Sequence, residues 1–422
     1  MAHVGWIDFS SAHRKKVGDV LSVLGGRGVM DELGIGVIRD TFSDAMFPGI
    51  STLHTRPKYF FILSRILREY FEQPDRKRER FGLDQHLDKE ELWCRQQLAT
   101  RYTDQENVTG IIGISLSDRE DRNVKQLPST MYWTGLRTFG LVRSDLSRGQ
   151  FIREHSGKKT LREVLAHTGT LKGDDEDADA HNLPPVCRLP SEEDEDHYWQ
   201  QLAITLTAAE AEFLKDQIIA TQPKSLLAVI LNNPQAVKAV VRLPRNASFE
   251  KLMTLPFMQD LKDETLQKTV LLARDFWRIL RGAHIRYNML LHQRFGQPGS
   301  YDSLWDEWQR EMRAFDWQSW DLDFIWHLVE AHQSKLRGHT KTFIKSWSEI
   351  AEHDAEHIDE LVIRQERANK GKRARLRSGA KNQKIKKWTG IDVINYRFAQ
   401  VRTLIEDVAR GMSGEANPDA GR

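Results

Sequence analysis

The sequence predicts a mainly α-helical protein: a multi-helix N-terminal domain with small β elements, followed by a tryptophan-rich helical C-terminal domain. Apolar residues recur at three- and four-residue spacing over most of the chain, which is the period of a helix with one buried face. Serine, threonine or aspartate precedes several of these stretches, and glycine or proline follows them. With 422 residues, 40% of them apolar, the chain is long enough for two or three domains.

The N-terminal helices are predicted from their end signals. Asp31 is a candidate N-cap, and Pro57 suits the first turn of a helix because its missing N–H is not needed there. Gly25-Gly26 and Pro48-Gly49 are stop signals. The predicted helices cover residues 11–24, 31–46, 57–71 and 129–140.

Two short segments are the predicted β elements. Residues 6–9 form a short strand or a lead-in to the first helix. Residues 107–115, with the sequence NVTGIIGIS, form a buried strand or a tight glycine turn. The apolar period does not decide between these two structures.

The helical pattern is strongest between residues 200 and 360. It predicts helices over Leu202–Ile219 with Thr207 as a cap, over Leu266–Leu291, and within Tyr301–Trp347. A last amphipathic helix is predicted over Ile391–Val408. Seven tryptophans in this part are interpreted as the aromatic core of a helical bundle: Trp277, Trp305, Trp308, Trp317, Trp320, Trp326 and Trp347.

Changes in composition predict the domain organisation. Residues 1–170 are expected to form the catalytic and DNA-binding domain. Residues 171–199 form a charged linker with acidic runs, DDEDAD and SEEDED, around a proline-containing stretch. Residues 200–360 form the helical domain. Residues 361–422 hold a basic segment and the C-terminal helix.

The charge distribution is more informative than the net charge of +2. Residues 370–387 hold nine Lys or Arg and no Asp or Glu, so they are either a track for DNA phosphates or a solvated loop. Two cysteines are too few for a disulfide framework or a zinc site. The first residues lack the apolar core of a signal peptide, and no run of 18 apolar residues occurs. We therefore expect a cytoplasmic protein that does not contact a membrane.

The segment 27–61 has the least generic pattern in the chain. Glu32, Gly36, Asp40 and Asp44 follow one another at four-residue spacing and are predicted to share one face of a helix. Like charges at this spacing repel one another, and glycine inside a helix costs about 1 kcal/mol relative to alanine. Such a local loss of stability points to function, although a solvated acidic face is an equally good interpretation.

Five segments carry a resemblance to a known family. They are GWIDFS (5–10), DELGIGVIRD (31–40), FPGISTLHTRPKYF (47–60), YWTGLRTFG (132–140) and NYRFAQVR (395–402). Together they resemble an uncharacterised bacterial domain family that includes phage-defence DNA glycosylases. The resemblance implies an enzyme that removes glucosylated hydroxymethylcytosine from double-stranded phage DNA and leaves an abasic site.

The sequence offers candidates for such a reaction. Cleavage of an N-glycosidic bond develops positive charge on the sugar, which a carboxylate can stabilise. Asp40 is the first choice, and Asp44 and Glu32 are the reserves. A flipped base also needs aromatic walls, and the DNA backbone needs cations. The candidates for these contacts are Arg39, Arg56, Lys58, Tyr59, Tyr132, Trp133, Arg137, Lys384, Lys386, Lys387 and Arg397. Alternatively, Tyr59 and Trp133 belong to the core, and Arg56 pairs with Asp40 or Asp44.

Two other functions stay open. The three carboxylates could bind Mg²⁺ in a nuclease, or the protein could bind DNA without catalysis. No metal or cofactor is expected, because His353 and His357, although four residues apart, lie among acidic residues typical of a solvated face. Lys58 could form a Schiff base in a lyase, but a surface or phosphate contact is favoured, so we expect a monofunctional glycosylase.

Overall fold

The computed structural model describes residues 31–102, 104–105, 108–116, 124–156, 186–190, 195–296, 301–353, 357–377 and 387–414. Within these ranges the chain forms seventeen α-helices and no β-strand. An isolated antiparallel bridge joins Val142 and Cys187. The prediction of a mainly α-helical protein is confirmed, whereas the small β elements are not found in the described part of the chain. Residues 6–9 lie outside it.

The segment predicted as a strand or a glycine turn, residues 107–115, forms no strand in its described part, residues 108–115, where residues 112–115 make a turn. Gly110 and Gly113 have φ angles of +86° and +77°, which residues with a side chain rarely adopt. A Cβ atom on Gly110 would lie 2.9 Å from Cγ of Arg56. Both glycines therefore adopt backbone angles that an extended strand does not contain, so no strand forms there.

The chain divides into two compact units that are each discontinuous in sequence. One unit comprises Met1–Asp40 and Leu272–Ile394, and the other Thr41–Leu271 and Asn395–Arg422. We name them the tryptophan unit and the α3 unit. The two boundaries within helices fall in α2 (Gly36–Met46) and α14 (Glu264–Arg294). The predicted linker at 171–199 lies mostly outside the described residues, and the predicted domain boundaries stay a prediction.

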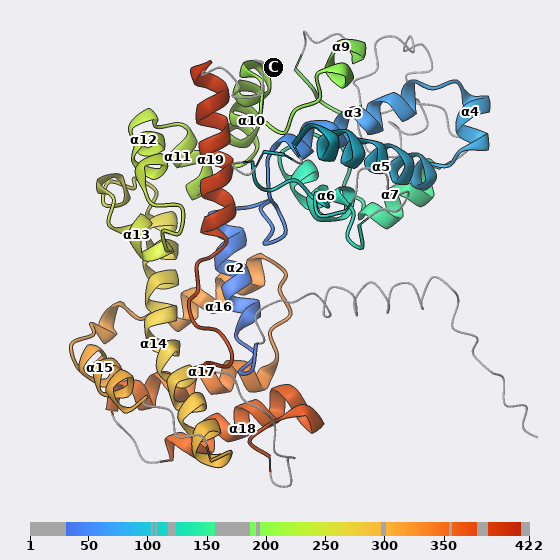
Figure 1. The fold of residues 1–422 in the computed structure, drawn as a ribbon. Helices are drawn as coiled ribbons and strands as arrows, with labels where there is room; N and C mark the ends of the chain where they lie inside the picture. The colour runs from blue at the N-terminus through green and yellow to red at the C-terminus, as the bar shows by residue number, and fades with distance from the viewer. Residues whose placement is uncertain are drawn as a thin grey trace, which may run out of the picture. The chain divides into compact units, whose positions relative to one another are not determined.

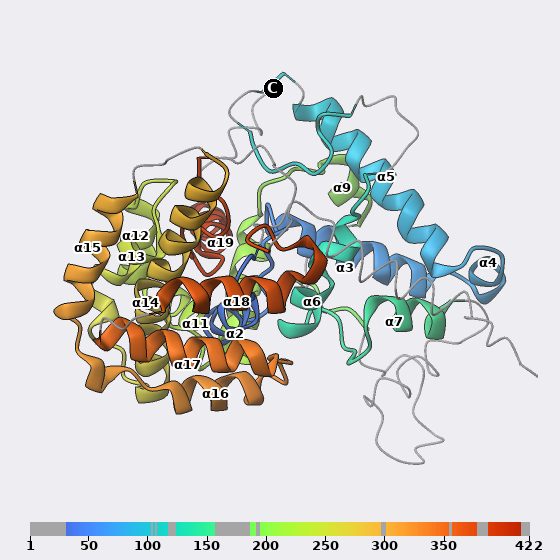
Figure 2. The same cartoon turned by 90° about the horizontal axis from the view of Figure 1, so that it is seen from below.

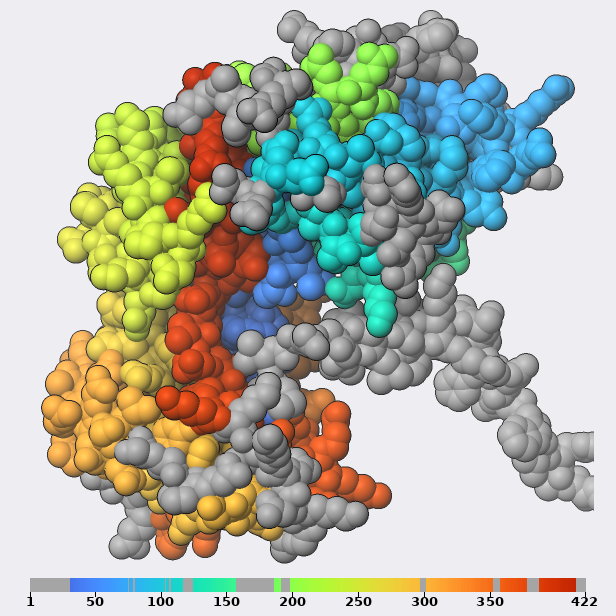
Figure 3. Space-filling model, viewed as in Figure 1, coloured from blue at the N-terminus to red at the C-terminus, as the bar shows by residue number. Residues whose placement is uncertain are grey.

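The α3 unit holds most of the helices (Figure 1). They are α3 (Lys58–Glu72), α4 (Asp75–Arg80), α5 (Leu83–Tyr102), α6 (Pro128–Thr138), α7 (Arg148–His155), α9 (Glu195–Gln200), α10 (Ala208–Thr221), α11 (Leu226–Leu231), α12 (Pro234–Arg242), α13 (Phe249–Met253), η2 (Pro256–Met258) and α19 (Phe398–Ser413). Helix α3 packs against α5 and α6, as Figure 2 shows. Helix α19 packs against α10 and α12. Figure 3 shows yellow-green segments beside the red C-terminal helix. The sequence of α3 is apolar on most sides, so this helix forms the centre of its group.

The tryptophan unit contains α15 (Asp302–Arg313), η3 (Trp317–Ser319), α16 (Leu322–Ala331), α17 (Gly338–His353), α18 (Ile358–Lys370) and η4 (Gly371–Arg373). Trp305 and Trp308 stack with their ring centroids 4.8 Å apart, and Trp308 lies 5.6 Å from Trp347. Gly282 of α14 accommodates this cluster, because a Cβ atom there would lie 2.2 Å from the Trp308 indole. The aromatic-core interpretation is confirmed for these three tryptophans and for Trp277, all of which are buried. Trp317, Trp320 and Trp326 are only half-buried.

Local side-chain hydrogen bonds set several helix ends where the sequence predicted them. The Thr207 hydroxyl accepts the N–H of Glu210, whose carboxylate accepts the N–H of Thr207, so the predicted cap is confirmed as a capping box. Helix α10 begins at Ala208, and the prediction of helix from Leu202 onward was therefore wrong over the residues before the cap. A second capping box joins Ser147 and Gln150 at the start of α7.

Helix α2 begins later than predicted. The Asp31 carboxylate accepts hydrogen bonds from the N–H groups of Gly34, Ile35 and Gly36, and Gly34 has a φ angle of +76°. The chain therefore turns tightly around Asp31 before the helix starts at Gly36. Consequently, Glu32 is not on the face of α2 that carries Asp40 and Asp44. A Cβ atom on Gly36 would lie 2.8 Å from the Asp31 carboxylate, so the close approach of this carboxylate explains why a glycine occupies the position.

Helix α19 also begins later than predicted, at Phe398 rather than Ile391. Tyr396 and Arg397 have φ angles of +46° and +63°, which interrupt a helix. The side chain of Asn395 accepts the N–H of Phe249 and Tyr396 packs edge-on against the ring of Phe249, so tertiary contacts hold this turn.

Among the described residues, no helix is long and apolar enough to cross a membrane.

Candidate functional site

The loop between α2 and α3, residues 50–56, is held by Tyr132 of α6. The Tyr132 hydroxyl accepts the N–H groups of Thr55 (2.8 Å) and Arg56 (3.1 Å) and donates to the carbonyl of Arg56 (2.9 Å). His54 stacks on the Tyr132 ring with centroids 4.2 Å apart. Burial raises the pKa of Tyr132 to about 12 and lowers the pKa of His54 to about 4, so both are neutral at pH 7. Tyr132 therefore supports the loop rather than presenting a polar group to a ligand.

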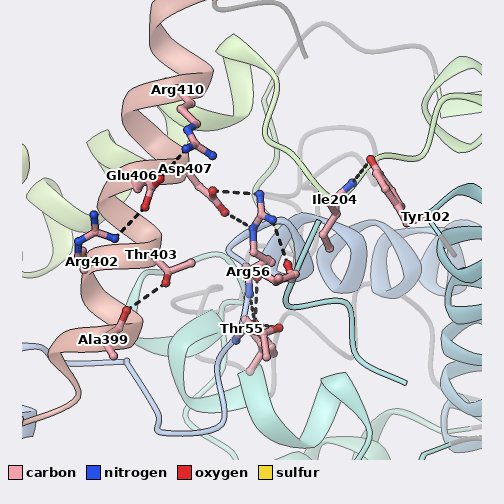
Figure 4. Close-up of polar contacts among 12 residues, drawn as sticks. Thr55, Arg56, Tyr102, Ile204, Ala399, Arg402, Thr403, Glu406, Asp407 and Arg410 are labelled. Atoms are coloured by element: carbon pink, nitrogen blue, oxygen red, sulfur yellow. Dashed lines mark hydrogen bonds and ion pairs between the residues drawn. The ribbon is translucent and has the colours of Figure 1, made fainter. Parts of the chain in front are cut away.

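Arg56 is bound to α19. Its guanidinium donates to both carboxylate oxygens of Asp407, at 2.6 and 3.0 Å (Figure 4). It also donates to the carbonyl of Thr109 at 3.1 Å. A pairing of Arg56 was expected, but with Asp40 or Asp44. Asp407 is 351 residues away in sequence, and no local pattern marked it as the partner.

The three predicted carboxylates lie in three different environments. Glu32 is buried in the tryptophan unit, 3.1 Å from Nζ of Lys370. This ion pair gives the carboxylate a structural role. Asp40 is 44% exposed and accepts two hydrogen bonds from the neighbouring Arg39. Asp44, in the α3 unit, pairs with Arg397, which also donates to the carbonyl of Ile50. The catalytic assignment of Asp40 stays a prediction.

Lys58 and Tyr59 are both buried. Nζ of Lys58 lies 2.7 and 2.8 Å from the two carboxylate oxygens of Glu210 and is 3% exposed. The Tyr59 hydroxyl accepts the N–H of Ile112 at 2.8 Å, and burial raises the pKa of Tyr59 well above its usual value. In this conformation, neither side chain can contact DNA.

The other predicted contacts are structural or solvated. Trp133 is buried and donates to the carbonyl of Leu146, and Arg137 donates to the carbonyl of Ser144. Both therefore fix the segment between α6 and α7. Lys387 is exposed. Lys384 and Lys386 lie outside the described residues.

A groove of about 550 Å³ lies where α3, α5 and α9 meet, which is within the size range of small-molecule sites. Two tryptophans, Trp93 of α5 and Trp199 of α9, face each other edge to face with ring centroids 5.7 Å apart. Three glutamates surround them. The residues that line the groove are Glu69, Glu72, Gln73, Pro74, Glu90, Trp93 and Trp199.

Glu69 is the most firmly placed carboxylate of the groove. Its Oε1 accepts a hydrogen bond from the indole N–H of Trp199. Glu72 is 57% exposed and lies 3.8 Å from Arg68, and Glu90 pairs with its neighbour Lys89 at 2.9 Å. Glu69 is thus joined directly to an aromatic wall of the groove by a hydrogen bond. A carboxylate held in this way can accept hydrogen bonds from a ligand or stabilise a developing positive charge.

Sequence reasoning missed this groove. Glu69 and Glu72, and likewise Glu90 and Trp93, are three residues apart on their helices and could have been recognised as paired faces. Trp199, however, follows Glu69 by 130 residues, within a stretch predicted to be a linker. Nothing in the sequence indicates that Trp199 meets the residues of α3 and α5 in this groove.

Glu91, next to Glu90 on α5, faces away from the groove into a small cavity that Tyr59, Cys94 and Ile112 also line. Its Oε1 accepts the N–H of Ser129 at 2.6 Å, while Oε2 has no hydrogen-bond partner within the part of the chain that the structure describes. Burial raises the pKa of Glu91 to about 7, against the opposing effects of Ser129 and Arg148. Glu91 is therefore a buried group that titrates near neutral pH.

Glu91→Gln is expected to stabilise the protein at pH 8 but not near pH 4.5. The folded state binds the Glu91 proton more tightly than the unfolded state, so stability falls as the pH rises from about 4.5 to about 7. A shift of this size corresponds to about 3 kcal/mol, and the amide retains the acceptor for Ser129 without the charge. Urea unfolding of both proteins at each pH measures the difference. Equal stability of the two proteins at pH 8 would contradict the expected burial of a charged Glu91.

Among the described residues, no group of three or more His, Cys, Asp or Glu side chains is arranged to hold a metal ion. No curated protein and no solved structure matches the chain. The model of a family of unknown function, DUF6361, matches residues 1–410 of the 422. A match over nearly the whole length, both compact units included, assigns the chain to the DUF6361 family.

Proposed function

We propose that the protein is an anti-phage DNA glycosylase that hydrolyses the N-glycosidic bond of a modified, glucosylated hydroxymethyl cytosine and leaves an abasic site. The observation that carries the proposal is the groove in which a firmly held carboxylate, Glu69, lies beside two tryptophans. Aromatic walls suit a base that has left the DNA stack, and a carboxylate suits the sugar cation that forms when the bond breaks. The resemblance of the five sequence segments supports the same reaction.

Each part of the groove has a role in this reaction. The flipped base stacks against Trp93 and Trp199. The bond between C1′ and the base nitrogen breaks with its electrons moving to the base, and Glu69 stabilises the positive charge on the sugar. Water adds to C1′ and loses its proton to Glu69, and this proton then passes to the nitrogen of the released base, which regenerates the carboxylate. The glucosyl hydroxyls of the modified base find hydrogen-bond partners in Glu72, Gln73 and Glu90.

The rim of the groove supports a nucleic-acid substrate. Helix α4 follows directly after Pro74 of the groove and exposes Arg76, Lys77 and Arg80. Cations in this place attract DNA phosphates and offset the repulsion by the glutamates in the groove. The acidic interior and the basic rim thus suit a substrate whose backbone is anionic and whose reacting sugar becomes cationic.

The product of the reaction tests the proposal. A labelled duplex with one glucosylated hydroxymethylcytosine is expected to stay intact with the protein and to break at that position only after alkali. The released base should be detectable by mass spectrometry, and an unmodified duplex should be unaffected. Borohydride should trap no covalent adduct, because Nζ of Lys58 is engaged by Glu210.

Other outcomes would overturn the proposal. Strands broken without alkali, with no adduct trapped by borohydride, would identify a nuclease. Modified DNA that is bound but unchanged would identify a non-catalytic defence component.

A further inference from the structure

We propose that Tyr198 is a positioning residue for the groove: its ring, contacted by Lys58 and Arg65, sets the place of Trp199 and hence the width of the groove. We call the contacts of Lys58 and Arg65 with the Tyr198 ring the clamp. Its effect on the position of Trp199 is independent of the proposed function, and only its effect on the substrate rests on that function.

Two cations of α3 contact the Tyr198 ring. Nζ of Lys58 lies 4.5 Å from the ring centroid, and the guanidinium carbon of Arg65 lies 3.8 Å from it. Tyr198 and both cationic side chains are buried. Because cation–π attraction is strongest where water is excluded, these contacts fasten the ring to α3.

The clamp is itself fixed by a third element. Lys58 bonds both carboxylate oxygens of Glu210, and Glu210 is part of the capping box that begins α10. The cation cannot leave the Tyr198 ring without breaking a buried ion pair. The position of Tyr198 is therefore determined by α3 and α10 together.

The position of Trp199 depends on that of Tyr198. The two rings lie edge to face with centroids 5.0 Å apart, and they belong to the six-residue helix α9. A helix of this length is not stable by itself, so its contacts determine where it lies. Trp199 then meets Trp93 with its ring and Glu69 with its N–H. Loss of the clamp should release one wall of the groove and the hydrogen-bond donor of Glu69.

Two substitutions at Tyr198 separate the aromatic ring from simple apolar burial. Tyr198→Phe keeps a ring for both cations, whereas Tyr198→Leu keeps apolar volume without a π face. The protein is labelled with 5-fluorotryptophan, and the ¹⁹F resonance of Trp199 is assigned by its loss in Trp199→Phe. We expect Tyr198→Leu to shift or broaden this resonance and Tyr198→Phe to leave it in place. Arg65→Met, which removes one cation, should move it in the same direction as Tyr198→Leu.

The matched control is Tyr301→Ala. Tyr301 is 6% exposed, as is Tyr198, but it belongs to the tryptophan unit. This variant should leave the Trp199 resonance unchanged. An unchanged resonance in Tyr198→Leu, or an equal shift in Tyr198→Phe, would overturn the clamp.

Kinetics then connect the clamp to the substrate. Tyr198→Leu should raise the KM for the modified duplex about tenfold, the order expected when a base loses a stacking partner, and Tyr198→Phe should restore it. A shifted Trp199 resonance in a protein whose wild type releases no base would support the clamp and refute the glycosylase. Normal KM values with a shifted resonance would show that Trp199 is not a substrate wall.

Discussion

Glu69→Gln is expected to lower the rate of base excision by about 10²- to 10⁴-fold while the protein stays folded. The amide oxygen can still accept the hydrogen bond from Trp199, so the groove should keep its shape. The negative charge that stabilises the sugar cation is lost. Single-turnover excision from a modified duplex measures the rate, and a thermal unfolding curve checks the fold.

Two variants serve as controls for Glu69. Glu72→Gln removes a carboxylate of the same groove that is 57% exposed, and its rate should stay within about tenfold of the wild type. Asp40→Asn tests the assignment made from the sequence. Full activity of Glu69→Gln together with an inactive Asp40→Asn would return the catalytic role to Asp40.

Lys58→Met is expected to reduce the free energy of unfolding by about 3–5 kcal/mol. The substitution retains an apolar stem but leaves the Glu210 carboxylate, which is completely buried, without its cation. It also removes one of the two cations from the Tyr198 ring. Urea unfolding at pH 7 measures the loss.

The double variant Lys58→Met/Glu210→Gln separates the ion pair from packing. Glutamine still completes the capping box of α10 but brings no charge into the interior. Most of the lost stability should therefore return. If the double variant is as unstable as Lys58→Met, the loss comes from packing and not from the unpaired carboxylate.

Helices with strong local signals could be predicted from the sequence. Helix α3, predicted over 57–71, spans Lys58–Glu72, and α6, predicted from near Ser129, begins at Pro128. Thr207 was predicted as a cap, and its partner in the structure, Glu210, is only three residues away. Such contacts lie within one turn of the chain, and the order of residues alone determines them.

Helices that begin under tertiary control were predicted less well. The start of α19 depends on the left-handed Tyr396 and Arg397, which contacts from the distant Phe249 and Asp44 hold in place. The pattern of apolar residues continues through this turn, so periodicity could not show it. The same applies to α2, where hydrogen bonds to Asp31 form a turn instead of a first helical turn.

The candidate site shows most clearly which features the sequence determined and which only the tertiary structure decided. The residue types of the sequence determined that the protein is helical and that tryptophans of its second half form an aromatic core, but they left open whether Tyr59 and Trp133 contact DNA or belong to the core. Each is a statement about one residue and its near neighbours. Tertiary structure alone decided the partners of Arg56 and Lys58 and the meeting of Glu69, Trp93 and Trp199. These contacts join residues up to 351 positions apart, and which of many equivalent carboxylates and tryptophans meet depends on how the helices pack.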